Sequence, residues 1–450
     1  MTAHRKRFRQ SRLAPLLLLG LALVALAAWA QERRVIDWPR PKDVGVEMLD
    51  VRQFEQELSR PSFAVTIDFR FTDQWRASGI AFEHQIVDDA GKYYKPVHYD
   101  HGNGLAIADV DGDRLEDVYF TSQLGGNALY KNLGNGTFRD ITAEAAVAVA
   151  DRISVTASFA DIDNDGDADL YVTTVRGGNL LFRNDGSGHF TDVTAEAGVG
   201  YVGHSSAAVF VDFDRDGRLD LLLVNVGRYT GEDQGQGGYY VGYQDAFLGH
   251  LEPERTEQSI LYRNTDGLHF ADVSAAVGLE DGSWSGDATF TDFNGDLYPD
   301  LYVLNMQGDD HYYENQQGRR FVDRSAEVFP KTPWGTMGIK FFDYDNDGDF
   351  DLLLTDMHSD MSREVTPGYE KLKSLMTWSD EVLQGGANNI FGNAFYRNLG
   401  GGRFEEVSDQ LGLENYWPWG VSVGDLNADG FEDVFVTSSM NFPWRYGVNS

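Results

Sequence analysis

The sequence predicts an all-β fold, a β-propeller assembled from a repeated four-stranded sheet. Three observations predict it. An acidic loop occurs six times, residues that favour β-strands flank every copy, and a second hairpin pattern built on Gly and Asn turns separates most copies. Four short strands in a repeat of about 50 residues are typical of a propeller blade.

The stretch DIDNDGDADLYVTT at 161–174 shows what each acidic loop contains. Asp161, Asp163 and Asp165 place a carboxylate at every second position, Gly166 permits a tight turn, and Asp169 returns a fourth carboxylate before an apolar run. Like charges 4 Å apart repel by about 1 kcal/mol per pair even in water, so a bound cation is expected to offset the repulsion. Oxygen ligands without His or Cys favour a hard ion, and the number of carboxylates favours Ca²⁺ over Mg²⁺.

The other loops begin at Asp109, Asp212, Asp292, Asp343 and Asp425. All six have an acid at positions 1, 5 and 9 and Asp or Asn at position 3, whereas position 7 varies between Asp, Arg, Leu, Tyr and Phe. That variation is expected if position 7 binds the ion through its backbone carbonyl, which every residue carries. The predicted ligands of up to six Ca²⁺ ions are Asp109, Asp111, Asp113, Leu115, Asp117, Asp161, Asp163, Asp165, Asp167, Asp169, Asp212, Asp214, Asp216, Arg218, Asp220, Asp292, Asn294, Asp296, Tyr298, Asp300, Asp343, Asp345, Asp347, Asp349, Asp351, Asp425, Asn427, Asp429, Phe431 and Asp433.

An EF-hand shares the opening of this loop but requires a bidentate Glu at position 12 and a helix on each side. Position 12 is apolar in every copy, and the residues after position 9 are β-formers such as LYVTT and LLLVN. The sequence therefore predicts a metal-binding hairpin between two strands and excludes the EF-hand.

The acidic loops recur with a period of about 51 residues, and two intervals are longer by roughly 30 residues. The second hairpin pattern is an apolar strand, a Gly or Asn turn, and a Phe that opens another strand. Its copies cover residues 127–142, 179–194, 259–274, 311–325 and 393–408. No 3.6-residue periodicity runs through the repeat, which excludes helical solenoids, and the repeat is too long for the nonapeptides of a calcium-binding β-helix.

The first 60 residues are expected to lie outside the repeats. Residues 1–30 combine a basic segment, an apolar core from Leu16 to Ala28 and a small-x-small cleavage site, which predicts a secretory signal peptide. An uncleaved membrane anchor is the alternative. Residues 31–60 are predicted to be a linker and 61–450 the repeat body, which begins with an alternating strand from Phe63.

The composition of the chain restricts its expected partners and its expected location. The chain carries 37 basic and 71 acidic residues, a formal net charge of −34, which disfavours nucleic acids and anionic membrane surfaces as partners. It has no Cys, so neither disulfides nor a lipoprotein anchor is expected, and metal ions would brace an exported fold instead. This suits a bacterial periplasm or exterior, where calcium fills even sites of about 10⁻⁴–10⁻³ M. A hydrophobic share of 42% argues against disorder.

The two long intervals hold insertions at about 227–258 and 358–392. The first is rich in Gly and Tyr, and two interpretations of its tyrosines stay open. They form an aromatic platform for a ligand, or they pack on the edge of a blade. The second includes a stretch that predicts a short amphipathic helix covering the propeller. The tyrosines of the first insertion are Tyr229, Tyr239, Tyr240 and Tyr243.

Histidines and tryptophans near the loops have simpler interpretations. His98 and His101 are three residues apart, a spacing that points them to opposite faces of a strand and so disfavours a transition-metal site. His358 follows an acidic residue in the second insertion. Trp284, Trp334 and Trp419 recur before the fourth, fifth and sixth loops, and we expect them to pack between blades.

The six loops with flanking Phe, Leu and Val runs resemble FG-GAP (VCBS-type) repeats, the kind found in the propellers of integrin α-subunits. The fuller resemblance, over 71–450, is to secreted bacterial proteins related to cartilage acidic protein, which carry these repeats before a C-terminal ASPIC/UnbV domain. The resemblance implies a seven-bladed propeller with Ca²⁺ in the blade hairpins, and it brings no catalytic residues.

The chain departs from that family at its end, because no ASPIC/UnbV region follows the repeats. Asn449 and Ser450 stand where the third strand of a blade should begin. Residues 71–80 align with 190–199, the final strand of a blade. We therefore expect strands from both ends of the chain to share one blade, and a ring of six or seven blades that is left open by one or more strands.

The main functional prediction is a secreted or periplasmic, calcium-stabilised propeller that binds protein or glycan in adhesion. One alternative is a propeller-based enzyme that acts on polysaccharide, with two carboxylates as general acid and base. Another is a scaffold for a C-terminal ASPIC/UnbV domain. The sequence contains no nucleophile elbow, P-loop or dinucleotide-binding fingerprint.

Overall fold

The computed structural model describes residues 71–85, 87, 103–234, 239–243, 249, 251–357, 389–390, 392–413 and 418–438. All the helices and strands described below belong to one compact unit, Asp73–Met440. The predicted signal peptide, the linker and residues 63–70 of the predicted first strand lie outside the described residues. So do His98, His101, His358 and nearly all of the second insertion.

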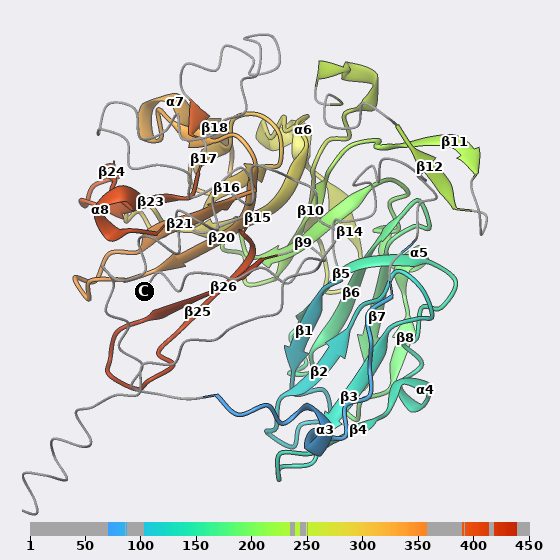
Figure 1. Cartoon of the computed structure of the whole chain (residues 1–450). Helices are drawn as coiled ribbons and strands as arrows, with labels where there is room; N and C mark the ends of the chain where they lie inside the picture. Colours follow the sequence, from blue (N-terminus) through green and yellow to red (C-terminus); the bar gives the residue numbers. More distant parts are fainter. Residues whose placement is uncertain are drawn as a thin grey trace, which may run out of the picture. The chain divides into compact units, whose positions relative to one another are not determined.

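The described chain forms five four-stranded antiparallel sheets and three two-stranded sheets. The five larger sheets and the last two-stranded sheet, numbered 1 to 6 here, follow one another in chain order (Figure 1). Sheet 1 contains β1 (Leu105–Ala108), β2 (Asp117–Phe120), β3 (Ala128–Asn132) and β4 (Phe138–Asp140); sheet 2 contains β5 (Ile153–Ala160), β6 (Asp169–Val175), β7 (Leu180–Asn184) and β8 (Phe190–Asp192); sheet 3 contains β9 (Ser205–Val211), β10 (Asp220–Asn225), β13 (Ile260–Asn264) and β14 (Phe270–Asp272); sheet 4 contains β15 (Ser285–Thr291), β16 (Asp300–Asn305), β17 (His311–Asn315) and β18 (Phe321–Asp323); sheet 5 contains β20 (Thr336–Phe342), β21 (Asp351–Asp356), β23 (Ala394–Asn398) and β24 (Phe404–Glu406); and sheet 6 contains β25 (Pro418–Gly424) and β26 (Asp433–Ser438).

The acidic loops connect the first and second strands of every sheet, and we number them loops 1 to 6 after their sheets. In all six, the residue before position 1 pairs with the acid at position 9, as Ala108 pairs with Asp117 in sheet 1 and Ala160 with Asp169 in sheet 2. A strand therefore flanks each loop on both sides, so the predicted hairpin is confirmed and the EF-hand stays excluded. The Gly and Asn turns join the third and fourth strands, as predicted.

Successive sheets pack face to face, and the second strands show how the sequence achieves this. In β6, Leu170 and Val172 pack against sheet 1, whereas Tyr171 between them packs against sheet 3. Side chains of a strand point alternately to its two faces, so a strand covered on both faces needs a continuous apolar run. Every residue of β6 is buried, and the same holds for β10, β16 and β21.

A four-residue helix follows the fourth strand of each complete sheet, and the sequence analysis missed these helices. Each begins at a Thr or Ser whose backbone N–H donates to an acid two residues earlier, as Thr194 does to Asp192 (2.9 Å). The signal was therefore present as an acid-x-Thr/Ser pattern. The helices are α4 (Thr142–Ala145), α5 (Thr194–Ala197), α6 (Ser274–Val277), α7 (Ser325–Val328) and α8 (Ser408–Leu411).

The prediction of a strand at residues 71–80 is wrong, because this segment contains the helix α3 (Trp75–Ser78) and residues 71–74 pair with no strand among the described residues. Its alignment with 190–199 nevertheless has a structural counterpart. Gly79 ends α3 in a left-handed conformation, and a Cβ there would lie 3.0 Å from the carbonyl oxygen of Phe138 on β4. Gly198 after α5 stands in the same way against Phe270 of the next sheet. The segment thus takes the place of the helix that ends a preceding sheet.

The first insertion leaves sheet 3 between β10 and β13, at the end of the sheet opposite loop 3. It forms a small hairpin of β11 (Thr230–Gln234) and β12 (Tyr240–Gly242) and a 3₁₀ turn, η4 (Pro253–Arg255). Tyr229 is buried with Val155, Trp284 and Met306. Arg176 lies over the ring of Tyr240 and Arg255 over that of Tyr243. These packed tyrosines favour the blade-edge interpretation over the ligand platform.

A further strand pair, β19 (Thr332–Pro333) and β22 (Asn389–Ile390), lies outside this insertion and is parallel.

His204 clamps the two stems of this insertion to sheet 3. The imidazole Nδ1 lies 2.7 Å from Glu257 Oε1 in the exit stem, and Nε2 lies 2.8 Å from Thr230 Oγ1 in the entry stem. The backbone N–H of His204 also donates to Glu257 Oε2 (2.6 Å). Burial alone would raise the pKa of Glu257, but the bonds from His204 outweigh it and hold the pKa below its usual value.

The all-β prediction and the repeated four-stranded sheets are confirmed. Trp284 and Trp334 are buried as expected, and Trp419 is half-buried. Sheet 1 leaves Leu105 and Ile107 more than half exposed, at 55% and 53%, and no strand pairing joins sheet 6 to sheet 1 among the described residues. In the same part of the chain, no helix has the length and apolar character to cross a membrane.

Candidate metal centres

All six loops share one backbone conformation, in which positions 4 and 6 are left-handed. Loop 1 has Gly112 and Arg114 at these positions, with φ of 75° and 68°, and loop 2 has Asn164 and Gly166, with φ of 61° and 95°. The remaining loops follow the same pattern even where the residue is Leu297 or Ala428. A left-handed residue other than Gly costs about 1–2 kcal/mol, so other interactions must hold the loops in this shape.

The acids at positions 1 and 5 supply those interactions. Asp161 accepts hydrogen bonds from the backbone N–H groups of Asp165 (3.1 Å) and Gly166 (2.9 Å), and the position 1 acid does the same in every loop. Asp165 in turn accepts the N–H of Asp167 at position 7 (3.0 Å), again as in all six loops. The acids at positions 1 and 5 therefore hold the backbone of the loop in its conformation, in addition to contributing negative charge.

The acid at position 9 ties the loop to the sheet behind it. In loop 3, Asp220 Oδ2 accepts the N–H of Phe213 (3.2 Å), and its Oδ1 accepts the N–H of Asn264 on β13 (2.8 Å). The bond to the residue at position 2 occurs in all six loops, and the bond to the third strand occurs in sheets 1 to 5. One carboxylate thereby fixes the loop, its hairpin and the third strand.

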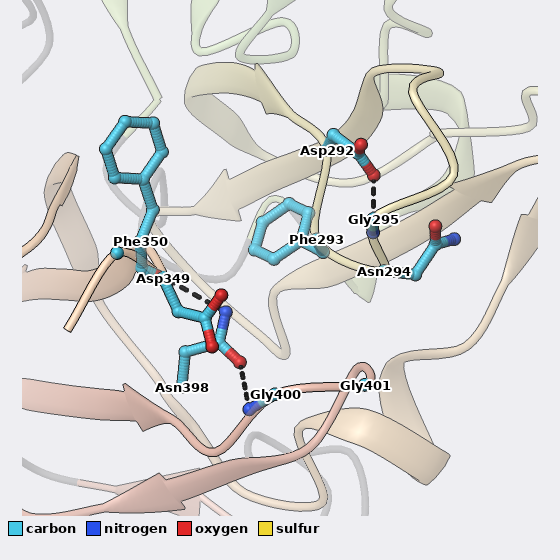
Figure 2. Close-up of a pocket in the computed structure, with 10 residues that line it drawn as sticks. Asp292, Phe293, Asn294, Gly295, Asp349, Phe350, Asn398, Gly400 and Gly401 are labelled. Atoms are coloured by element: carbon cyan, nitrogen blue, oxygen red, sulfur yellow. Dashed lines mark hydrogen bonds between the residues drawn. The ribbon is translucent and has the colours of Figure 1, made fainter.

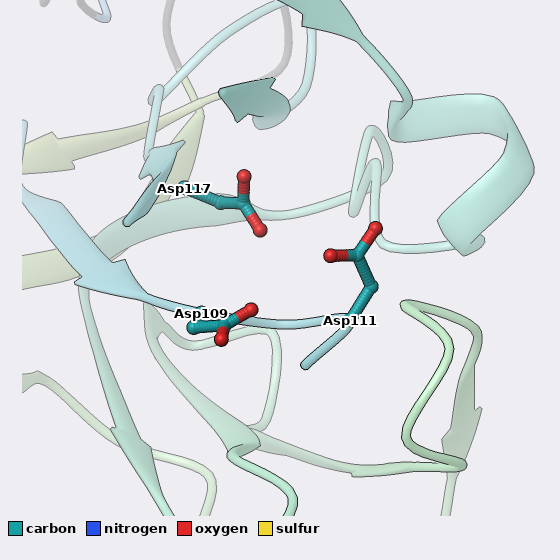
Figure 3. Close-up of side chains that lie close together, drawn as sticks. All are labelled: Asp109, Asp111 and Asp117. Carbon is teal, nitrogen blue, oxygen red and sulfur yellow. The ribbon is translucent and has the colours of Figure 1, made fainter. Parts of the chain in front are cut away.

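Carboxylates from three positions converge in four of the loops. Positions 1, 3 and 9 converge in loops 1, 2 and 3, and positions 1, 3 and 5 converge in loop 5, with one oxygen of each acid within 4.8 Å of the others. Figure 3 shows the three side chains of loop 1, Asp109, Asp111 and Asp117, directed toward a common point. In loops 4 and 6 position 3 is Asn, and no three acids converge there among the described residues.

Two further observations fit a hard cation at these points. Asp111 Oδ1 and Asp163 Oδ1, both at position 3, are buried oxygens without a hydrogen-bond partner, and a buried carboxylate oxygen left unpaired is costly. The converging donors are all oxygens, which are the ligands that Ca²⁺ takes. The residues present therefore fit calcium, whereas the carbonyl of position 7 as a ligand stays a prediction.

Burial raises the pKa of the position 9 acids in loops 1 to 5. It raises the pKa of Asp169, Asp220 and Asp300 to about 7 and that of Asp351 to about 6, although two backbone N–H bonds to each oppose the shift. Burial also raises the pKa of Asp163 and Asp214 at position 3. A cation between these groups would favour their charged forms and reverse that trend.

The side chains at position 7 have different surroundings in different loops. Leu115 and Tyr298 are half-buried and Phe431 is exposed. Arg218 is not indifferent, because its guanidinium contacts Asp216 and donates to the carbonyl of Asn264 (3.1 Å). Loop 3 therefore contains a positive side chain of its own.

Hydrogen bonds from side-chain amides join neighbouring sheets beside loops 1, 2 and 3. The Asn that ends the third strand donates from Nδ2 to position 2 of the preceding loop, as Asn184 does to Val110 (2.9 Å). Asn264 and Asn315 repeat this bond to Ile162 and Phe213. All four Asn residues also donate to a carbonyl of their own sheet, as Asn398 does to Phe350 (3.1 Å), but among the described residues Asn398 makes no bond to sheet 4.

A pocket of about 170 Å³ lies at this fourth junction, between loops 4 and 5. Figure 2 shows Asp292, Phe293 and Asn294 on one side of it and Asp349 with Asn398 on the other. Its carboxylates, Asp292 and Asp349, belong to loops 4 and 5 themselves. The pocket is therefore part of the loop end of the sheets.

The repeats match a family model described as FG-GAP-like repeat, over residues 109–172, 161–223, 292–354 and 379–436. The first three segments each start at position 1 of one loop and end at position 12 of the next, and the last ends at position 12 of loop 6. Together the segments cover more than half of the chain. The chain belongs to the FG-GAP-like repeat family. Its loops and sheets are thus those of an FG-GAP-like repeat protein, as the resemblance implied.

Curated relatives extend the similarity beyond single repeats. The chain is 25% identical over 326 residues to cartilage acidic protein 1 of Xenopus tropicalis, covering 69% of this chain and 45% of that protein. It is 23% identical over 328 residues to the human protein of the same name, covering 70% of this chain and 44% of the relative. The chain therefore spans less than half the length of these relatives.

Solved structures show weaker likeness. The biofilm matrix protein Bap1 of V. cholerae aligns at 13% identity with a TM-score of 0.31, over 56% of this chain and 34% of Bap1. A putative exo-β-1,3-galactanase from Bifidobacterium bifidum aligns at 13% identity with a TM-score of 0.29, over 57% of this chain and 83% of that chain.

Proposed function

We propose that this FG-GAP-like repeat protein is a secreted, calcium-stabilised binding module whose partner is a protein or a glycan. The observation that carries the proposal is the convergence of carboxylates at equivalent positions of successive loops that share one strained backbone. Calcium there would be structural, because the same acids hold the loop, the hairpin and the third strand together. The thirty predicted ligand residues and the number of ions, up to six, belong to this proposal.

The proposal extends to architecture and location. Sheets that pack face to face in chain order are the blades of a propeller, and the helix α3 occupies the place that ends a preceding sheet. We include a closed ring, of seven blades by family resemblance, in the proposal. Export through the N-terminal signal peptide would bring the loops into calcium-rich surroundings, where weak sites also fill.

A binding role is favoured over polysaccharide hydrolysis by the position of the carboxylates. General acid and base catalysis needs two carboxylates that face a substrate pocket and are free for proton transfer. The carboxylates that line the described pocket, Asp292 and Asp349, are loop acids already committed to the predicted ion sites. No observation in the described part of the chain favours the enzyme.

Calcium removal tests the proposal. A ligand at 100 times its Kd adds about 2.7 kcal/mol per site to the free energy of unfolding, so several filled sites should raise Tm by about 10 °C or more. Melting curves of the full chain in EDTA and in millimolar CaCl₂, measured by calorimetry, should differ by that amount. An equal Tm in both buffers would contradict structural calcium. MgCl₂ at the same concentration is the matched control and should restore little of the stability.

A further inference from the structure

Two of the six loops already hold a positive side chain. Lys131 on β3 forms ion pairs with Asp111 and Asp113 of loop 1, and its ammonium lies 2.8 Å from Asp113 Oδ2. Arg263 on β13 pairs with Asp214 Oδ2 (2.6 Å) and Asp216 Oδ2 (3.3 Å) of loop 3. In both loops the partners are the acids at positions 3 and 5, which are among the predicted calcium ligands.

Lys131 and Arg263 occupy equivalent places in their sheets. Each directly precedes the Asn of the third strand whose backbone N–H donates to the position 9 acid. The same place holds Arg183 in sheet 2, Glu314 in sheet 4 and Arg397 in sheet 5. Within the described residues, Arg183 and Arg397 form no ion pair with the acids of loops 2 and 5.

Loops 2 and 5 differ from loops 1 and 3 in their charge as well. Both have a fifth carboxylate at position 7, Asp167 in loop 2 and Asp349 in loop 5. The position 3 oxygen Oδ1 is buried without a hydrogen-bond partner in loop 2 (Asp163) as in loop 1 (Asp111), but in loop 1 the other oxygen of Asp111 contacts Lys131. Among the described residues, no side-chain cation pairs with the acids of these two loops to offset their mutual repulsion.

We propose that Lys131 and Arg263 are resident counter-ions, so that loops 1 and 3 bind Ca²⁺ more weakly than loops 2 and 5. The inference rests on the proposed calcium-binding function and assigns its strong and weak sites. In loop 1 a divalent ion must displace the ammonium from the oxygens that it contacts, or lie close to a like charge, and either costs binding free energy. Loops 2 and 5 gain the full attraction of five acids.

The same side chains give the chain two kinds of loop at low calcium. Loops 1 and 3 keep their carboxylates partly neutralised without metal, because the counter-ion belongs to the neighbouring strand. Loops 2 and 5 depend on the metal to relieve repulsion. Removal of Lys131 should therefore affect the metal-free protein more than the calcium-loaded one.

Calcium titration of the EDTA-dialysed full chain by calorimetry tests the proposal, together with melting curves in EDTA and in CaCl₂. Lys131→Gln should raise the affinity of one weak site by about tenfold or more, since one opposing charge is removed. It should also lower Tm in EDTA, and this deficit should shrink in CaCl₂. Arg183→Gln is the matched control at the equivalent position of sheet 2, and it should leave both measurements unchanged.

Arg263→Gln provides a second, independent variant for loop 3 and should raise the affinity of a different site. The proposal is overturned if both variants leave every calcium affinity unchanged, or if each lowers Tm equally in EDTA and in CaCl₂. A wild-type chain that binds no calcium at all is a different outcome, because it contradicts the proposed function itself. Tight binding by all the sites of the wild type would overturn the division into two classes alone.

Discussion

The two ends of the sheets are built in different ways. At the loop end, six loops repeat one backbone conformation and one set of carboxylate bonds, so the same local solution is used in each sheet. At the opposite end, the connection between β10 and β13 depends on His204, Glu257 and Thr230, a combination that no other sheet repeats in the described residues. The same carboxylate bonds therefore recur in every predicted ion site, whereas a single set of side chains holds the insertion on sheet 3.

A substitution at the loop end should lower the free energy of unfolding more than any other proposed here. Asp220→Ala removes the acceptor of two buried backbone N–H groups, those of Phe213 and Asn264. Each unpaired buried donor costs about 1–3 kcal/mol, so the free energy of unfolding should fall by about 4 kcal/mol in urea titrations. Asp151→Ala, at an exposed acid, is the control and should change it little. A loss below about 1 kcal/mol for Asp220→Ala would remove the structural role given to position 9.

A substitution at the insertion end should loosen the insertion without affecting the loops. His204→Ala removes the imidazole that lies within hydrogen-bond distance of Glu257 Oε1 and Thr230 Oγ1, and each buried polar group left unpaired costs about 1–3 kcal/mol. We expect limited proteolysis within 227–258 to become faster, while calcium binding at the loops stays unchanged. His189→Ala, at an exposed histidine of sheet 2, should leave proteolysis unaffected. If His204→Ala also weakens calcium binding, the two ends are coupled and the comparison fails.

A buried acid in sheet 4 should make the stability of the protein depend on pH. Asp310 stands where sheet 1 has Asn127, and it accepts hydrogen bonds from the N–H of Asn305 (2.7 Å) and the hydroxyls of Tyr302 and Thr336. Asn127 instead donates from Nδ2 to the equivalent hydroxyl, that of Tyr119 (2.8 Å). Burial raises the pKa of Asp310 to about 8, so the folded protein keeps it protonated at neutral pH.

The sign of the effect follows from that raised pKa. An unfolded Asp titrates near 3.9, so the stability contributed by protonated Asp310 is full below about pH 4 and is lost as pH rises through about 8. Asp310→Asn cannot ionise, and its advantage over the wild type in free energy of unfolding should grow from pH 5 to about pH 8 and then level off. Asn127→Asp is the reciprocal control and should introduce the same pH-dependent loss into sheet 1. Parallel pH profiles for wild type and Asp310→Asn would refute a protonated Asp310.

The smallest effect should come from backbone strain in loop 4. Leu297 at position 6 has φ of 73°, and its side chain is 68% exposed, so little packing is lost on its removal. Leu297→Gly should raise the free energy of unfolding by about 0.5–1 kcal/mol, because Gly adopts this conformation without a Cβ clash. Leu297→Ala keeps the Cβ and should give no gain. Equal stabilities of the two variants in urea titrations would show that the loop is not strained there.

Sequence patterns predicted the features that rest on local spacing. The alternating acids and the β-formers after position 9 located all six loops and their hairpins, because the ligands and the strand pairing lie within a dozen residues. The helices after the fourth strands were missed, since four residues are too few for a helical period. The hydrogen bond from the Asn264 side chain to the carbonyl of Ile162 spans 102 residues, and the contact of Lys131 with Asp111 joins β3 to loop 1. Both depend on which sheets and strands become neighbours, which spacing alone does not give.

Hydrogen bonds from side-chain amides also distinguish the junctions between sheets. Asn184, Asn264 and Asn315 each donate to the loop of the preceding sheet as well as within their own sheet, whereas Asn398 donates only within its own sheet among the described residues. The junction of sheets 4 and 5 has packed aromatic side chains at this place, among them Phe293, Phe329 and Phe404. Aromatic packing therefore joins these two sheets at the loop end without that hydrogen bond.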